Sequence, residues 1–186
     1  TPIRYIRKAL LITFNRLWSQ ARSQLTTLKI SSSELEDYRQ QSEIMLLNYS
    51  HWMLSNKFKT PDFTELRLYS KKIKLMGIVD AVYQEPGKTI ITDYKTSQCA
   101  ELTDDINRQA AIYALLYYEK YDEIPEKIQI HFLINPDDPV SIGVDEHLLE
   151  YSRLLVKFIR EKTSSIHEMD YPCTCGGFCE KDLRNK

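Results

Sequence analysis

The chain has 186 residues, of which 42% are hydrophobic and 27% are charged, and its formal net charge is −1. These values are typical of a single soluble globular domain, and the near-neutral charge excludes a polycation that binds nucleic acid over its whole surface. No apolar run approaches the roughly 20 residues that a membrane-spanning helix needs. Contact with nucleic acid would depend on local clusters of Lys and Arg, such as those at residues 4–8 and 71–74.

The first third of the chain is expected to be helical. Apolar residues recur every three or four positions from Ile3 to about Ser23, which predicts a first amphipathic helix. Ser31 and Glu34 have the spacing of a capping box, and they predict a second helix that ends near Ser55.

After Pro61 the pattern changes to short runs of strand-forming residues. Strands are expected at residues 63–69, 73–83 and 88–94, and the Pro86-Gly87 pair predicts a tight turn between the last two. A helix follows to about Tyr121, with Asp104 or Asp105 as its N-cap. The remaining elements are strands at 127–134 and 140–144 and a helix from Asp145 to about Lys162. This order predicts an α/β fold with a mixed central sheet flanked by helices.

Two aspartates in the predicted hairpin indicate a cation site. With Pro86 and Gly87 at the centre of the turn, counting back along both strands places Asp80 directly opposite Asp93. Their Cβ atoms would then lie roughly 4.5–5.5 Å apart, an unfavourable arrangement for two negative charges in apolar strands. A cation between them would relieve the repulsion, and such hard oxygen ligands suit Mg²⁺ or Mn²⁺.

Lys95 follows Asp93 by two residues, so strand alternation places both side chains on one face. A bound metal ion with an adjacent ammonium group is what phosphodiester hydrolysis requires. The metal can activate water, and the ammonium can offset charge that develops on the phosphate. The alternative is a surface ion pair between Asp93 and Lys95, with Asp80 merely ending a strand.

Three short motifs resemble the RecB-like branch of the PD-(D/E)XK nuclease superfamily. The segment Gly77-Ile78-Val79-Asp80 resembles the Gly-x-x-Asp motif of that branch, and Ile91-Thr92-Asp93-Tyr94-Lys95-Thr96-Ser97 resembles its Asp-Tyr-Lys-Thr-Ser motif. Gln109 and Tyr113 match the Gln-x-x-x-Tyr motif, and their spacing directs both from one face of a helix.

This resemblance implies a restriction-endonuclease-like core and a set of site residues. The implied catalytic residues are Asp80, Asp93, Lys95, Gln109, Tyr113 and Glu65, and the implied metal ligands are Asp80, Asp93 and Glu65. Glu65 stands where many relatives carry an acidic residue, although an exposed strand glutamate explains it equally well. Several relatives also have a histidine ligand on an N-terminal helix; His51 is expected to serve packing or surface instead, and Glu43 is the alternative ligand.

The cysteines indicate a second site near the end of the chain. Cys173, Cys175 and Cys179 resemble the C-terminal trio that holds a [4Fe–4S] cluster in CRISPR-associated and AddB-type nucleases, although their spacing is tighter. Zinc is an alternative to the cluster as the bound cofactor. A further alternative is that the three cysteines are free thiols and hold no cofactor. Cys99 is the earliest cysteine, so the fourth ligand stays open. The cysteine usage favours a cytoplasmic protein rather than a disulfide-bonded one.

The predicted organisation is one nuclease domain, with a helical part at 1–60, a catalytic core at 61–165 and a cysteine-bearing tail at 166–186. The expected function is metal-dependent cleavage of DNA, single-stranded or at ends, in repair, recombination or defence, with a helicase as a further partner. Endonuclease or exonuclease action stays open. The alternatives are an inactive nuclease-fold module that binds DNA or a helicase, and a small zinc-binding interaction domain.

Overall fold

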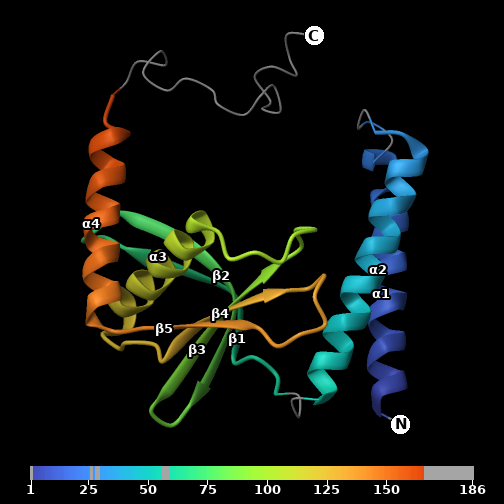
Figure 1. The fold of residues 1–186 in the computed structure, drawn as a ribbon, viewed down its shortest axis with the longest axis horizontal. Helices are drawn as coiled ribbons and strands as arrows, with labels where there is room; N and C mark the ends of the chain where they lie inside the picture. The colour runs from blue at the N-terminus through green and yellow to red at the C-terminus, as the bar shows by residue number, and fades with distance from the viewer. Residues whose placement is uncertain (1, 26, 28–29, 56–58, 166–186) are drawn as a thin grey trace.

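A computed structural model describes residues 2–25, 27, 30–55 and 59–165 (Figure 1). The helices are α1 (Pro2–Leu25), α2 (Ser32–Ser55), α3 (Asp104–Tyr121) and α4 (Glu146–Lys162). The strands are β1 (Phe63–Ser70), β2 (Leu75–Glu85), β3 (Lys88–Lys95), β4 (Lys127–Phe132) and β5 (Val140–Gly143). In the described part of the chain, each helix is too short or too polar to span a lipid bilayer.

The five strands form one mixed sheet in the order β1-β2-β3-β4-β5. Neighbouring strands are antiparallel except β3 and β4, which are parallel because the chain passes through α3 between them. The predicted α/β fold, with a mixed sheet flanked by helices and a helical N-terminal part, is confirmed, and it is consistent with a restriction-endonuclease-like core.

Local sequence signals explain where several elements begin and end. Ser31 and Glu34 form the predicted capping box: the Ser31 N–H donates to Glu34 Oε2 at 2.9 Å, and the Glu34 N–H donates to Ser31 Oγ at 3.2 Å. Gly87 has a φ of 72°, which a glycine in the β2–β3 turn adopts without strain. The predicted cap of α3 was wrong by one or two residues, because the Thr103 side chain accepts from the Ile106 N–H.

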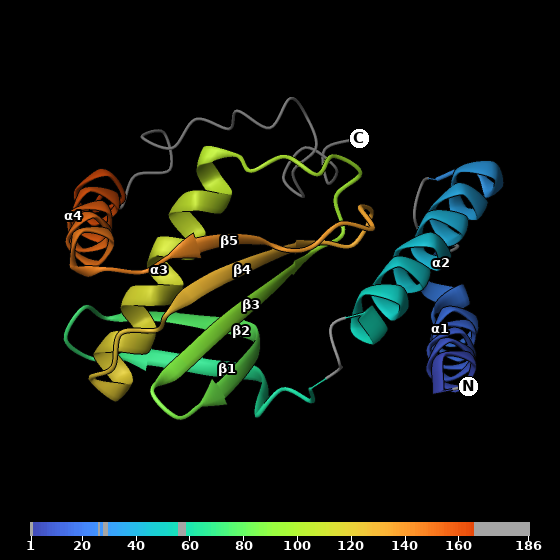
Figure 2. The ribbon, with the colours of Figure 1, turned by 60° about the horizontal axis from the view of Figure 1, so that its bottom comes forward.

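The hydrophobic core lies between the sheet and α3. Its fully buried members include Leu68, Val79, Val82, Ile91, Leu115 and Ile128. Helix α4 packs against the outer side of α3, and the buried Ser152 hydroxyl donates to the Ala111 carbonyl at 2.8 Å. Figure 2 shows α3 lying across one face of the sheet, with α4 beyond it and the α1–α2 pair at the opposite end of the molecule.

Helix α2 contacts the sheet near the ends of β3 and β4. Tyr49 and Trp52 of α2 pack against His131 of β4, with ring centroids 5.7 and 4.6 Å apart, and Tyr49 also meets the ring of Tyr94. The side-chain amide of Asn48 donates to the carbonyls of Leu133 and Ile134 at 3.1 and 2.9 Å. These contacts fix the N-terminal helices beside the carboxyl end of β3.

Candidate active site at the fork between β2 and β3

Strands β2 and β3 separate at Asp80 and Asp93. Their ladder runs from the turn to the pair Ala81–Thr92, which is the predicted register. Beyond that pair, the first half of β2 continues with β1, and the end of β3 continues with β4. The sheet therefore forks where the two aspartates face each other.

The carboxylate of Asp80 occupies the point of the fork. Its Oδ2 atom accepts a hydrogen bond from the backbone N–H of Tyr94 at 2.7 Å. A strand N–H that has lost its partner strand needs another acceptor, because an unpaired buried N–H is costly. Asp80 thus replaces a missing ladder bond, and this contact also fixes the orientation of its carboxylate.

The direction of the β2 side chains changes close to this point. A Cβ added at Gly77 would lie 2.9 Å from Leu116 Cδ1 of α3, and the Gln84 side chain donates to Tyr117 of the same helix. Gly77 and Gln84 therefore both face α3. They are seven residues apart, and strict alternation along a strand would place them on opposite faces of the sheet. The alternation of side chains along β2 is therefore broken between Gly77 and Gln84.

The backbone of Glu65, on the neighbouring strand β1, is also irregular. Its φ is 50°, a value at which an L-residue is strained.

A chain of polar contacts joins β3 to α3. The Lys95 ammonium lies 2.6 Å from Asp93 Oδ2 and donates to Gln109 Oε1 at 2.5 Å. The Gln109 amide in turn donates to the Tyr113 hydroxyl at 2.9 Å. The structure therefore brings together all four of these predicted site residues, and the helical spacing of Gln109 and Tyr113 makes the last step possible.

Burial and charge perturb the titration of these groups. Burial raises the pKa of Asp93, the Lys95 ammonium opposes this shift, and the negative charge of Asp80 adds to it. The pKa of Tyr113 is also raised, first by burial and then by the nearby charges of Asp93 and Asp80. Both aspartates therefore act on the same phenol, which places Asp80 on the α3 side together with Asp93.

The donor set at the fork suits a divalent metal ion. Asp93 is only 4% exposed, and its Oδ2 faces the Lys95 ammonium at 2.6 Å. The negative charge of Asp80 raises the pKa of Asp93, and a neighbouring pair of carboxylates matches the hard, anionic ligands of Mg²⁺ or Mn²⁺. No third His, Cys, Asp or Glu joins them within the described ranges. Mg²⁺ commonly binds through one or two carboxylates and completes its shell with water and phosphate oxygens.

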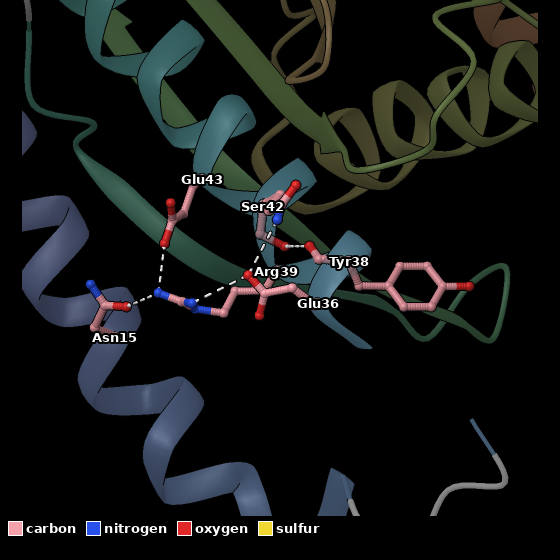
Figure 3. Close-up of polar contacts among 7 residues, drawn as sticks. Asn15, Glu36, Tyr38, Arg39, Ser42 and Glu43 are labelled. Atoms are coloured by element: carbon pink, nitrogen blue, oxygen red, sulfur yellow. Dashed lines mark hydrogen bonds and ion pairs between the residues drawn. The ribbon is translucent and has the colours of Figure 1, made fainter. Parts of the chain in front are cut away.

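The candidates for a third ligand lie apart from this pair. Glu65 is exposed and does not join Asp80 and Asp93 in a three-residue group among the residues described. Glu43 accepts from Arg39 at 3.0 Å, and the same guanidinium donates to Asn15 of α1, so Glu43 helps to join α2 to α1 (Figure 3). His51 is exposed on α2.

The predicted cluster ligands Cys173, Cys175 and Cys179 lie outside the described residues. Cys99 is exposed in the segment after β3, and its thiol lies 3.8 Å from a carboxylate oxygen of Glu101.

Sequence reasoning missed an aromatic group on the face of β3 opposite the aspartates. Tyr94 points away from the aspartates, and its hydroxyl lies 3.3 Å from those of both Tyr49 and Tyr83. His131 completes this group; it is 1% exposed, and its Nδ1 has no hydrogen bond among the described residues. Burial lowers the pKa of His131 to about 4. The available signal was a His between two apolar residues, Ile130 and Phe132.

Comparison with known proteins agrees with this geometry. The model of the PD-(D/E)XK nuclease superfamily matches residues 5–180. No curated protein matches the chain. A solved structure of a candidate exonuclease from Eubacterium rectale is similar to it, with 15% identity and a TM-score of 0.44 over 76% of this chain and 61% of that one. The chain thus spans less than two thirds of that neighbour. Since the family match extends over nearly all 186 residues, the protein belongs to the PD-(D/E)XK nuclease superfamily.

Proposed function

We propose that this protein is a Mg²⁺- or Mn²⁺-dependent deoxyribonuclease that hydrolyses phosphodiester bonds. The observation that carries the proposal is the fork itself. Two opposed aspartates, Asp80 and Asp93, lie beside a lysine that Gln109 holds by a hydrogen bond of 2.5 Å. A nuclease superfamily and a site with these groups support the same chemistry.

Each side chain has a role that follows from its contacts. Asp80 and Asp93 would hold the cation, which when bound lowers the pKa of a water molecule and binds a phosphate oxygen. Lys95 places a positive charge where negative charge develops on the phosphate, and it can orient the attacking water. Gln109 fixes the Lys95 ammonium, and Tyr113 fixes the Gln109 amide. Glu65 stays a predicted contributor from the neighbouring strand.

Cleavage of end-labelled DNA tests this proposal. Wild-type protein is incubated with single- or double-stranded DNA and Mg²⁺ or Mn²⁺, beside Asp93→Asn and Lys95→Ala. The matched control is Asp137→Asn, which changes an exposed aspartate outside the site. We expect cutting that chelation abolishes and that both site variants lose by about 100-fold or more. Absence of cutting by folded wild-type protein, with either metal, would instead favour an inactive module that binds DNA or a helicase.

The finer assignments rest on sequence motifs. The Asp-Tyr-Lys-Thr-Ser segment supports the RecB-like branch, and with it a role in repair, recombination or defence beside a helicase partner. Cys173, Cys175 and Cys179 support an iron–sulfur cluster or zinc. Iron, sulfide and zinc analysis of anaerobically purified protein tests the cofactor. A triple Cys→Ser variant with unchanged metal content would contradict it.

A further inference from the structure

A pocket near the end of β3 contains none of the residues of the proposed hydrolytic site. It measures about 510 Å³ and lies between the two N-terminal helices and the segments that follow β3 and β4. We call it the α2 pocket; its walls include Phe14, Tyr38, Gln41, Met45, Thr96 and Gln98. Its volume is within the range of about 300–1,000 Å³ that is typical of small-ligand sites.

The α2 pocket is joined to the active site through Lys95. Thr96, in its wall, is the residue that directly follows Lys95. Leu133, also in its wall, donates its backbone N–H to the Lys95 carbonyl at 2.9 Å. A ligand in the pocket would therefore contact the segment that directly follows Lys95, the residue that we place at the reacting phosphate.

The chemistry of the pocket fits a nucleobase rather than a phosphate. None of the residues that line it is charged. Tyr38 is 50% exposed, and in Figure 3 its ring is directed away from the Arg39 contacts that join the two helices. Gln98 donates to Gln41 at 2.9 Å across the pocket wall, so two side-chain amides are held where they can meet the polar edge of a base. Proteins commonly bind an unpaired base by stacking it on an aromatic side chain and forming hydrogen bonds to its edge.

From these observations, and resting on the proposed nuclease function, we infer that the α2 pocket binds an unpaired base of the substrate strand next to the scissile phosphate. Tyr38 supplies the stacking surface, and Gln41 and Gln98 supply hydrogen bonds. Bases inside a duplex are already stacked and paired, so a site of this kind favours a single-stranded segment.

Binding without cleavage tests the inference. Fluorescence anisotropy of a labelled single-stranded oligonucleotide, with Ca²⁺ in place of Mg²⁺, is compared for wild type, Tyr38→Ala and Tyr38→Phe. The matched control is Tyr151→Ala on α4, where the tyrosine is 47% exposed, close to the 50% of Tyr38. We expect Tyr38→Ala to weaken binding by about 5- to 150-fold. Tyr38→Phe, Tyr151→Ala and all binding to duplex should be unchanged.

A second series identifies the base. Oligonucleotides with one abasic position, scanned along the sequence, should weaken wild-type binding at one position, and Tyr38→Ala should show no further loss there. If Tyr38→Ala binds single strands as wild type does, or abasic positions have no effect, the inference is overturned. If Tyr38-dependent binding occurs without cleavage in Mg²⁺ or Mn²⁺, the pocket stands and the nuclease proposal fails. If the wild-type protein cleaves DNA but Tyr38→Ala binds single strands as wild type does, the nuclease proposal stands and the pocket inference fails.

Discussion

The carboxylate of Asp80 accepts the backbone N–H of Tyr94 at 2.7 Å, so one side chain both orients a proposed metal ligand and closes the end of a strand ladder. The two roles can be separated by substitution. Asp80→Asn keeps a carbonyl oxygen that can accept this bond, whereas Asp80→Ala does not.

We therefore expect both Asp80 variants to lose cleavage but to differ in stability. Asp80→Ala should lower the free energy of unfolding by about 1–3 kcal/mol, because the Tyr94 N–H loses its acceptor. Asp80→Asn should stay within about 1 kcal/mol of wild type. Urea unfolding in EDTA measures both values without a contribution from metal binding. Equal stability of the two variants would show that the Tyr94 bond contributes little.

Gln109 is expected to act by positioning Lys95. Gln109→Ala removes the acceptor that holds the Lys95 ammonium, and we expect kcat to fall about 10- to 100-fold with little change in KM. Metal affinity, measured by titration calorimetry, should stay close to that of wild type, because the two aspartates are retained. Asn107→Ala, on the exposed side of the same helix turn, is the control. A loss of metal affinity in Gln109→Ala would contradict a purely positioning role.

Gly77 is expected to be intolerant of a side chain because α3 lies directly above it. A Cβ at this position would lie 2.9 Å from Leu116 Cδ1 and 3.3 Å from the Tyr113 ring. Gly77→Ala should cost about 1–3 kcal/mol by overpacking, and it should reduce cleavage because Tyr113 is displaced. Gly143→Ala is the matched control, since nothing lies within 4 Å of the added Cβ. Thermal melting of both variants decides the point; equal melting temperatures would show that α3 shifts without cost.

His131 is expected to make stability depend on pH. Its pKa is about 4 in the folded protein and about 6.5 when unfolded, so between these values the unfolded chain binds a proton that the folded chain does not. The free energy of unfolding should therefore fall as pH is lowered from 6.5 to 4, by up to about 3 kcal/mol from this residue.

His131→Phe isolates this contribution from that of the carboxylates, which titrate in the same range. The ring would keep its packing against Trp52 and Tyr49. We expect the stability difference between variant and wild type to change in favour of the variant as pH falls from 7 to 4.5. A constant difference across that range would show that His131 is not held neutral by burial.

Much of the hairpin could be predicted from sequence. The Pro86-Gly87 turn fixes the register of β2 and β3 because a short turn leaves few ways to pair the residues on either side. Counting from that turn placed Asp80 opposite Asp93, and the structure has this register through Ala81 and Thr92. The capping box of α2 and the shared direction of Gln109 and Tyr113 were likewise local, since both depend on residues three or four positions apart.

Tertiary structure decided four features: the placement of Gln109 against Lys95, the fork at Asp80, the strain at Glu65 and the pocket between the N-terminal helices. The contact of Gln109 with Lys95 depends on where α3 crosses the sheet. The fork forms because β2 continues with β1 while β3 continues with β4. Pairing between distant segments is set by packing of the whole core, so no pattern within a short window records it. The sequence determined which groups could do the chemistry, and the packing of α2 and α3 on the sheet determined what they meet.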